Sequence, residues 1–373
     1  MNIGILGAGQ LARMLALAGF PLGHAFAFLD PQPDPCAAPL GRHLATPYTD
    51  ANALKELGSW ADVVTYEFEN IPAQALHILA EATVHPQPAA LFHSQDRLQE
   101  KRLFTALGIP TTIFQAVDNA DDLPRAAAAV GLPAVLKTRR LGYDGKGQAV
   151  VRRPEDLQPA WEAIGCQSAI LENLVPFTRE IAITAVRHSN GGTVFYPISE
   201  NIHVHGILRL SLARPQDPIQ TQAEAAAQAL LTHLQYVGTL TIEFFQHHHS
   251  LIANEFAPRV HNSAHWTIEG AETSQFENHI RAITGAPLGV APPRGYAAMV
   301  NCIGELPEPE KLLAIPGAHI HIYGKAPRPG RKLGHVTLRA DTPAALHRSL
   351  VQALEIVAQT DPLMHHVLHQ IQK

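Results

Sequence analysis

The sequence predicts an α/β protein, α+β overall, that opens with a Rossmann-like domain. Three observations carry this prediction. Short apolar strands alternate with helices over residues 2–107, a pattern typical of a parallel sheet. After Glu180 strands dominate, with two clear helices, which predicts a larger mixed region. The composition, 46% hydrophobic and 16% charged, is that of a globular chain, and 373 residues suggest two or three domains.

The first domain begins with a βαβ unit. Its expected elements are a strand over Asn2–Leu6, a helix over Gln10–Ala18 that stops at Gly19, a strand over Ala25–Leu29, a helix near Ala51–Leu57, a strand over Asp62–Thr65 and a helix over Pro72–Ala82. Ser94 is placed to cap a further helix that runs to Leu107, where Gly108 and Pro110 stop it. We therefore place the first domain over residues 1–115.

The region after residue 115 has a different order of expected helices and strands. Its expected elements are a helix over Leu123–Val130, strands over Ala134–Lys137 and Gln148–Arg152, a helix near Leu157–Ile164 and a strand over Ala169–Leu171. The polar, Gly-rich loop Thr138–Gly147 makes the first two of these strands an antiparallel hairpin. This region forms the predicted second domain, residues 116–180.

The last region is predicted as one large domain, residues 181–373, with a small β-rich subdomain from about 292. Helices are expected over Gln222–Gln235 and Gln275–Thr284, strands over Ala318–Tyr323 and Lys332–Arg339, and a helix at the C-terminus. The Pro-rich segment Ala286–Pro293 marks the start of the subdomain.

Charge and cysteine usage exclude several classes of protein. The 28 basic and 33 acidic residues give a net charge of −5, so we expect no nucleic-acid partner and no anionic membrane. The three cysteines, Cys36, Cys166 and Cys302, are far apart and predict neither a disulfide framework nor a cysteine metal site. Apolar stretches are shorter than a membrane span, and the N-terminus lacks a basic region before its apolar run. A cytoplasmic protein is the expectation.

The first chemical motif is the turn Gly7–Ala12 between a strand and a helix, with Asp30 ending the next strand. It satisfies the G-x-G-x-x-A fingerprint, in which the acidic residue binds the ribose of a dinucleotide. The turn by itself offers backbone N–H groups at a helix N-terminus, which suit any phosphate. An NAD-dependent dehydrogenase, another phosphate ligand and a purely structural turn all remain open.

The second motif is the loop that follows Lys137. It contains Gly142, Gly145 and Gly147, and it concentrates the positive charges of Lys137, Arg139, Arg140 and Lys146. Glycines let a backbone approach a ligand closely, and the cations favour phosphate. The loop joins strand to strand and lacks the Walker A pattern. We interpret it as a phosphate cradle, with a solvated hairpin tip as the alternative.

The third motif is a predicted hairpin over residues 239–256. Pairing its two strands around His249 places Glu243 opposite Glu255, with both side chains on one face. Facing carboxylates are unfavourable without a cation between them, so the pair predicts a divalent ion such as Mg²⁺; carboxylates tolerated in water are the alternative. Strict alternation points Asn254 to the other face unless a bulge intervenes. The run His247–His249 is interpreted as a solvated tip.

Beyond these motifs, the sequence resembles the ATP-grasp ligases, and within them the family that carboxylates 5-aminoimidazole ribonucleotide in purine biosynthesis. The matching segments are Gly9–Met14, Thr65–Asn70, Asp96–Leu98, Gly142–Gln148, Tyr196–Pro197, Glu200–His203, Asn254–Ser263, His265–Glu269, Ser274–Glu277, Tyr323–Lys325 and Arg328–Lys332. The family often has glycine where this chain has Ala12 and Ala264. The resemblance implies an ATP-grasp fold, with a pre-ATP-grasp domain first and residues 116–180 as a small lid domain.

The resemblance also implies roles for residues. Those that would bind ATP are Arg97, Lys137, Gly142, Tyr143, Asp144, Gly145, Lys146, Gly147, Gln148, Glu172, Asn173, Leu174, Val175, Glu180, His203, Asn254 and Glu255. Those that would contact the ribonucleotide are Gln10, Leu11, Glu67, Glu69, Tyr143, Lys146, Arg259, His261, Lys325, Arg331 and Lys332. Glu243 and Glu255 would carry Mg²⁺, or Mn²⁺. The catalytic set would be Lys137, Lys146, Glu243, Glu255, Arg259 and His261. Which of Glu67 and Glu69 contacts substrate stays open.

The implied reaction joins bicarbonate to the ribonucleotide. Bicarbonate would attack the γ-phosphate of ATP to give ADP and carboxyphosphate, which would release CO2 beside the exocyclic amine of 5-aminoimidazole ribonucleotide. Because carboxyphosphate is labile, the loop 139–147 would act as a lid that excludes water. Other ATP-grasp ligases, of the biotin carboxylase or glycinamide ribonucleotide formylating kind, are the nearest alternatives; they should lack the turn Arg328–Lys332. The resemblance further suggests a homodimer.

Overall fold

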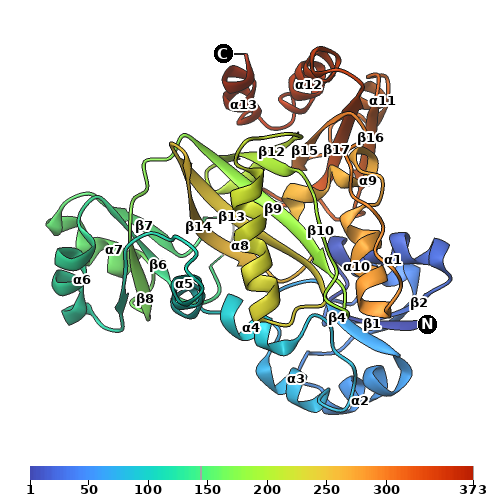
Figure 1. Ribbon diagram of the computed structural model, residues 1–373, viewed down its shortest axis with the longest axis horizontal. Helices are drawn as coiled ribbons and strands as arrows, with labels where there is room; N and C mark the ends of the chain where they lie inside the picture. The colour runs from blue at the N-terminus through green and yellow to red at the C-terminus, as the bar shows by residue number, and fades with distance from the viewer. Residues whose placement is uncertain (143–144, 373) are drawn as a thin grey trace.

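The computed structural model describes residues 1–142 and 145–372, within which the strands form three sheets (Figure 1). The first sheet is parallel, with the strand order β3-β2-β1-β4. Its elements are β1 (Asn2–Leu6), α1 (Gln10–Gly19), β2 (Ala25–Leu29), β3 (Arg42–Leu44), α2 (Ala51–Trp60), β4 (Val63–Tyr66) and α3 (Ala73–Ile78). The Rossmann-like βαβ start is confirmed, because β1 and β2 are apolar strands buried between helices.

The predicted helix start at Ser94 is wrong. Ser94 ends α4 (Pro88–Ser94), and a separate helix, α5 (Arg97–Ala106), follows it. The cap of α5 is Asp96, whose carboxylate accepts hydrogen bonds from the N–H groups of Leu98 (3.0 Å) and Gln99 (3.4 Å). Asp96 caps the helix because its buried carboxylate lies next to the free N–H groups of the first turn of α5, whereas Ser94 belongs to the preceding helix.

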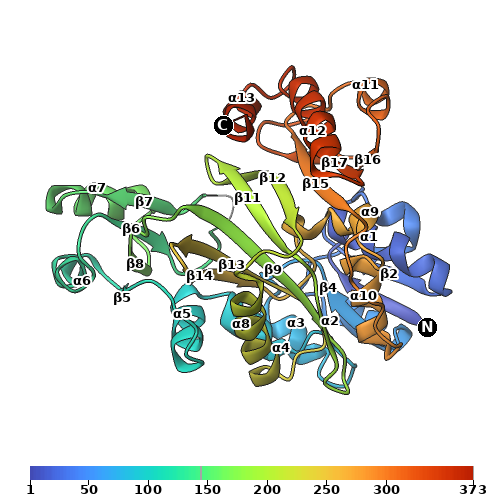
Figure 2. The same cartoon turned by 45° about the horizontal axis from the view of Figure 1, so that its top comes forward.

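The second sheet is small and antiparallel, with the order β5-β8-β6-β7. Its elements are β5 (Phe114–Val117), α6 (Leu123–Val130), β6 (Ala134–Thr138), β7 (Gln148–Val151), α7 (Leu157–Ala163) and β8 (Ala169–Asn173). With α6 and α7 it stands apart from the rest of the chain, as both views show (Figures 1 and 2). The hairpin predicted around the Gly-rich loop is the pair β6–β7.

The third sheet has nine antiparallel strands and forms the centre of the molecule. Eight of them follow the order β14-β13-β9-β11-β12-β15-β17-β16, and β10 pairs with β9. The strands are β9 (Arg179–Arg187), β10 (Thr193–Phe195), β11 (Ile198–Val204), β12 (Ile207–Arg214), β13 (Gly238–His247), β14 (Ser250–Ala257), β15 (Tyr296–Ile303), β16 (Ala318–Ile322) and β17 (Lys332–Ala340). The strands of the predicted C-terminal subdomain therefore continue the central sheet.

Helices cover this sheet and tie it to the first one. They are α8 (Gln220–His233), α9 (Thr267–Gly270), α10 (Gln275–Thr284), α11 (Pro309–Leu313), α12 (Pro343–Val357) and α13 (Met364–Ile371). The predicted single C-terminal helix is thus two helices. Helix α10 lies between α1 and β13, and its buried His279 bonds the N–H of Thr239 and the hydroxyl of Thr65. Within the described residues, the structure contains no helix that is both long and apolar enough to cross a bilayer.

Candidate active site

One cavity of about 1340 Å³ is lined by residues that follow the strands of the first sheet, by residues of the other two sheets, and by residues of the segment 323–331 between β16 and β17. We call this last segment the C-terminal loop. Most of the residues predicted from the sequence lie on its wall: Gln10, Leu11, Glu67, Glu69, Arg97, Lys137, Gly142, Gly145, Lys146, Gln148, Leu174, Glu180, His203, Glu243, Asn254, Glu255, Arg259, His261, Lys325, Arg331 and Lys332. Four other predicted residues that the structure describes do not line the cavity: Gly147, Glu172, Asn173 and Val175. Tyr143 and Asp144 lie outside the described residues.

A carboxyl group of the chain itself already occupies the N-terminal turn. The carboxylate of Glu67, at the end of β4, accepts hydrogen bonds from the N–H groups of Gly9 and Ala12, the latter at 3.0 Å. A Cβ on Gly7 would lie 2.5 Å from the Glu67 side chain, and one on Gly9 would lie 2.7 Å from it. The glycines are therefore needed for the close approach of a carboxylate, and the phosphate predicted at this turn would meet Glu67.

Asp30 likewise has internal partners. Its carboxylate accepts hydrogen bonds from the N–H of Ala8 (3.1 Å), the N–H of Gln32 (2.9 Å) and the hydroxyl of Tyr48 (3.0 Å). The side chain is buried. A dinucleotide ribose would have to displace these donors, so the geometry disfavours the dehydrogenase alternative.

Arg97 fixes the start of the glycine loop. Its guanidinium donates to the carbonyl oxygens of Thr138 (2.8 Å) and Gly142 (3.3 Å), and a Cβ on Gly142 would lie 2.6 Å from it. Gly142 must be glycine for this contact to form.

The loop's positive charge is smaller than the sequence predicted. Arg139 pairs with Asp96 at 2.7 Å and with Asp118 at 3.3 Å, and Arg140 pairs with Asp96 at 3.4 Å. The carboxylate that caps α5 thus neutralises part of the charge of both arginines. Lys137, Arg139 and Lys146 all line the cavity, so the predicted phosphate cradle keeps its cations at the wall although acidic side chains pair with the two arginines.

Lys137 belongs to a chain of buried charges. Its ammonium group lies 2.9 Å from Glu172, which in turn lies 3.7 Å from the ammonium group of Lys101. Burial raises the pKa of Glu172, but Lys101 and Lys137 outweigh burial and hold that pKa below its usual value. Glu172 is therefore ionised, and its carboxylate orients Lys137 at the wall of the cavity.

The two predicted metal carboxylates do face each other. Glu243 on β13 is the register partner of Glu255 on β14, and the register shifts immediately afterwards, so that Phe244 pairs with Ala253. Asn254 is the extra residue of this bulge, and it lines the cavity with both carboxylates. Burial, together with the charge of Glu255, raises the pKa of Glu243 to about 7. The two side chains and the bulged asparagine form an oxygen-rich set of the kind that suits a hard divalent cation.

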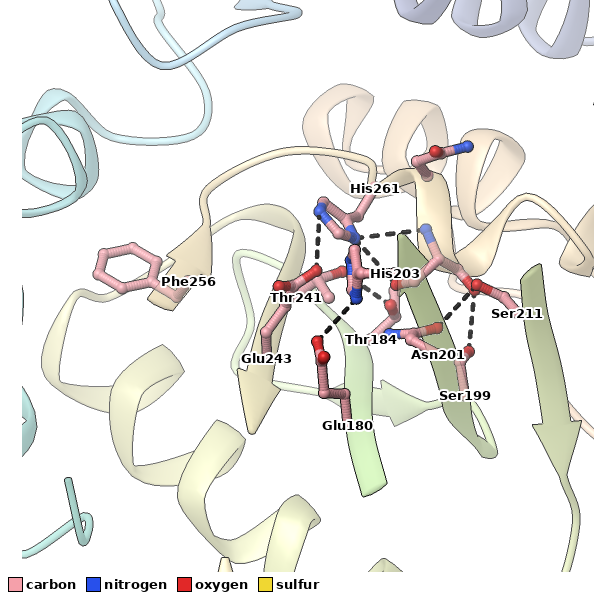
Figure 3. A network of polar contacts seen from close by, with 12 residues as sticks. Glu180, Thr184, Ser199, Asn201, His203, Ser211, Thr241, Glu243, Phe256 and His261 are labelled. Carbon is pink, nitrogen blue, oxygen red and sulfur yellow. Dashed lines mark hydrogen bonds and ion pairs between the residues drawn. The ribbon is translucent and has the colours of Figure 1, made fainter. Parts of the chain in front are cut away.

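Three strands carry the charged residues around Glu243 (Figure 3). Glu180 on β9 lies 2.7 Å from Nδ1 of His203 on β11. Burial lowers the pKa of His203, but the contact with Glu180 outweighs burial and raises it above the ordinary value. His261 lies 3.5 Å from Glu243, and burial lowers its pKa well below the ordinary range. His261 is therefore neutral near pH 7, whereas the protonated form of His203 is favoured over that of a free histidine.

The opposite wall of the cavity joins the first sheet to the C-terminal loop. Arg259 pairs with Glu69, and the ammonium group of Lys325 donates to the side-chain oxygen of Gln10. Arg331 donates to the carbonyl of Ala326 at 3.2 Å within the same loop. Residues predicted to bind the ribonucleotide therefore come together from segments more than 300 positions apart.

Sequence reasoning missed several residues of this site. Phe245, two positions after Glu243, stacks on Phe177 with ring centroids 4.9 Å apart at the cavity wall. The period-2 alternation of β13 could have indicated it. Glu100 and Lys101 are buried next to the bulge at Asn254. Their only sequence signal is two charges inside a helix, which is typical of an exposed face.

The histidine tip and other metal-ligand clusters add no further site. His248 has a positive φ of 53° at the turn between β13 and β14, and both His248 and His249 are exposed. Across residues 1–142 and 145–372, no group of three or more His, Cys, Asp or Glu side chains is arranged to hold a metal ion. A cation at Glu243 and Glu255 would therefore need further ligands, such as phosphate oxygens.

Family models match most of the chain. They are a ribonucleotide synthetase preATP-grasp domain over residues 1–95, an ATP-grasp domain over residues 102–276 and a phosphoribosylaminoimidazole carboxylase C-terminal domain over residues 297–349.

Similar proteins and structures have the same extent as this chain. The N5-carboxyaminoimidazole ribonucleotide synthase of Pseudomonas aeruginosa is 51% identical over 96% of this chain and 99% of its own. The crystal structure of N5-carboxyaminoimidazole ribonucleotide synthetase from Thermus thermophilus is 51% identical, with a TM-score of 0.92 over 95% of this chain and 98% of that one. The synthase from Aspergillus clavatus, in complex with ADP and 5-aminoimidazole ribonucleotide, is 28% identical, with a TM-score of 0.88 over 95% and 98%.

Proposed function

Because the chain belongs to the family of N5-carboxyaminoimidazole ribonucleotide synthetases, we propose that the cavity performs the family's reaction with the side chains described above. The chain is an ATP-grasp ligase that carboxylates 5-aminoimidazole ribonucleotide at the expense of ATP in purine biosynthesis. The roles of individual residues are our proposal.

We assign the nucleotide to the half of the cavity between the small and the central sheet. Lys137 and Lys146 neutralise its phosphates, and Arg97 holds the loop that covers them. Glu180 and His203 lie further along the central sheet, where the contact with Glu180 raises the pKa of His203 and so favours its charged form beside a phosphate. Glu172 acts on the nucleotide through its orientation of Lys137, and the segment Asn173–Val175 borders the base.

Glu243 and Glu255, with Asn254 beside them, are the groups we assign to Mg²⁺, with Mn²⁺ as a substitute. When bound, the ion supplies charge neutralisation for the phosphates as the γ-phosphoryl group is transferred. Its neutralising charge would also remove the repulsion between the two carboxylates.

The ribonucleotide takes the other half of the cavity. Lys325, Arg331 and Lys332 bind its phosphate, because the N-terminal turn is filled by Glu67. Arg259 and His261, beside Glu243, orient the reacting groups. The sides of the cavity thus bring the amine of the ribonucleotide next to the transferred phosphoryl group.

The reaction then runs in two steps. An oxygen of bicarbonate attacks the γ-phosphorus, the bond to the bridging oxygen breaks, and ADP leaves carboxyphosphate behind. Carboxyphosphate splits into CO2 and phosphate, the amine nitrogen attacks CO2, and the phosphate released beside it takes the proton. Catalysis consists mainly of positioning, charge neutralisation and exclusion of water.

The observation that carries this proposal is the single cavity that joins the facing carboxylates to the basic C-terminal loop. Its test is phosphate release from ATP with Mg²⁺ and bicarbonate, measured with and without 5-aminoimidazole ribonucleotide. We expect release that depends on the ribonucleotide, with one carbamate formed per phosphate. Release stimulated equally by glycinamide ribonucleotide or by biotin would contradict the assignment.

Two further expectations concern the whole protein: the oligomeric state follows from the family resemblance, and the compartment from the cysteine usage and the short apolar stretches. We expect the enzyme to be a homodimer in the cytoplasm. Sedimentation of the purified chain tests the first of these, and cell fractionation tests the second.

A further inference from the structure

The bulge that carries Glu255 lies on the edge strand of the central sheet. β14 is the last strand in the order: β13 pairs along one side of it, and on the other side Ala253 forms a single bridge with Thr111. A bulge leaves backbone groups of the extra residue without ladder partners, and such groups need other donors and acceptors when they are buried. What holds the backbone around Asn254 therefore also fixes the direction of the Glu255 side chain.

Two successive residues of α5 supply partners to this backbone, in addition to the hydroxyl of Thr111, which donates to the carbonyl of Ala253 at 2.9 Å. The ammonium group of Lys101 donates to the carbonyl oxygens of Ala253 (3.1 Å) and Asn254 (2.7 Å). The carboxyl group of Glu100 accepts a hydrogen bond from the N–H of Phe256 at 2.6 Å. These contacts hold the residues on both sides of Glu255, and both α5 side chains are only 1–2% exposed.

Lys101 also reaches the nucleotide side of the cavity. Its ammonium group lies 3.7 Å from Glu172, whose carboxylate orients Lys137 at 2.9 Å. Lys101 thus contacts both the backbone next to Glu255, the proposed metal ligand, and the carboxylate of Glu172. Glu172 in turn contacts Lys137, the proposed phosphate ligand. A buried lysine loses its hydration, which costs free energy. Lysines are therefore rarely buried unless acceptors such as these carbonyl and carboxylate oxygens are held in place around the ammonium group.

We propose that Glu100 and Lys101 are positioning residues for the metal–nucleotide site, which set the direction of Glu255 and its placement relative to Lys137. This inference rests on the proposed assignment of Glu255 to the metal. Glu100 also lines the cavity, but in this role each residue acts through the backbone of residues 253–256, and Lys101 acts also through Glu172.

A merely structural role predicts a different outcome. If the pair only filled space, its loss would lower stability without a selective effect on the metal or on ATP. A positioning role predicts weaker binding of the metal–nucleotide complex in a protein that still binds the ribonucleotide. It also predicts rescue by Glu100→Gln, because the amide oxygen can still accept from the N–H of Phe256.

The experiment measures Mn²⁺ binding directly, by electron paramagnetic resonance of free Mn²⁺ in the presence of ADP. The variants are Lys101→Met and Glu100→Ala, compared with Glu100→Gln and with Arg102→Met, which changes an exposed residue of the same helix. Circular dichroism checks folding, and calorimetry checks binding of 5-aminoimidazole ribonucleotide. We expect Lys101→Met and Glu100→Ala to weaken Mn²⁺ binding at least tenfold and to raise the KM for ATP more than the KM for the ribonucleotide. The two comparison variants should stay within about twofold of the native protein.

Glu255→Gln separates the two ways in which this experiment can fail. If Glu255→Gln binds Mn²⁺ as tightly as the native protein, the metal assignment itself is wrong. If Glu255→Gln loses binding while folded Lys101→Met and Glu100→Ala retain it, only the positioning role is overturned. Should Lys101→Met fail to fold, Glu100→Ala against Glu100→Gln decides, and equal Mn²⁺ affinities for these two overturn the proposal.

Discussion

Glu243 lies opposite Glu255 because β14 contains one extra residue, Asn254. The hairpin closes with His247 opposite Ser250, and a regular ladder from that turn would pair Glu243 with Asn254. Glu255 would then point to the other face of the sheet. The bulge restores the facing carboxylates and leaves Asn254 beside them on the cavity wall.

Glu255→Gln tests the metal assignment. The change removes one of two negative charges without changing the size of the side chain, so we expect turnover to fall by well over tenfold while the fold stays intact. Steady-state turnover at several Mg²⁺ concentrations and circular dichroism check this. Native activity at ordinary, saturating Mg²⁺ would mean that the ion binds elsewhere.

Lys146→Ala tests the role of the loop over the phosphates. Lys146 lines the cavity within the glycine loop, and its loss should impair closure more than chemistry. We expect ATP hydrolysis to rise relative to carbamate formation, because carboxyphosphate would then meet water. Phosphate and carbamate are measured in the same samples. An equal loss of both products would make Lys146 a simple binding residue.

Arg331→Ala tests the ribonucleotide side. A charge-assisted contact between arginine and phosphate contributes about 2 kcal/mol or more, so the KM for the ribonucleotide should rise about 30-fold. The KM for ATP should change far less. Arg348→Ala, an exposed arginine of α12, is the control. A larger effect on the KM for ATP would move the basic loop to the nucleotide site.

Asp30→Ala tests the dinucleotide alternative. If the protein is a ligase, the sequence predicts that this change has little effect. The structure corrects that expectation for stability, because Asp30 accepts three hydrogen bonds from other residues of the chain. We expect a loss of about 1–3 kcal/mol of unfolding free energy, since buried donors are left without partners. Thermal unfolding measures it, with the exposed Asp34→Ala as the control. Calorimetry should detect no NAD binding; micromolar binding lost in Asp30→Ala would restore the dehydrogenase reading.

The stability of the protein should fall in mild acid. Burial lowers the pKa of His279 to about 3, and burial also lowers the pKa of His261, His265 and His335 well below 6.5. The unfolded chain takes up these protons near pH 6.5 and the folded chain does not. Stability is therefore full above pH 6.5 and is lost as the pH falls from there toward 3.

His279 provides the test of this pH dependence. Between pH 7.5 and 5.5, each such histidine should remove about 1.4 kcal/mol. In urea unfolding at the two pH values, His279→Asn should reduce the difference by about that amount. His365→Asn, at an exposed position, should leave the difference unchanged. An unchanged difference in His279→Asn would show that this histidine has the same pKa in the folded and the unfolded chain.

Much of the local structure followed from the sequence. The strands Asn2–Leu6 and Ala25–Leu29 and the helices Leu123–Val130 and Gln275–Thr284 have the bounds that were predicted. Apolar periodicity, proline and glycine act over a few residues, so the pattern can be read without knowing what packs against it. The facing of Glu243 and Glu255 was also predicted, but from a regular hairpin centred on His249, whereas the structure reaches it through a turn at His247 and Ser250 and a bulge.

Contacts between distant segments were decided by the tertiary structure. The sequence offered the turn at Gly9 as a phosphate site, but Glu67 fills it from another strand. It counted Arg139 and Arg140 among the positive charges of a phosphate cradle, but Asp96 pairs with both. No local pattern in the sequence singled out Lys101, yet it is buried against the carbonyl of Asn254. A buried charge is stable only beside its partner, and where that partner lies depends on how the sheets pack, which local sequence patterns do not encode.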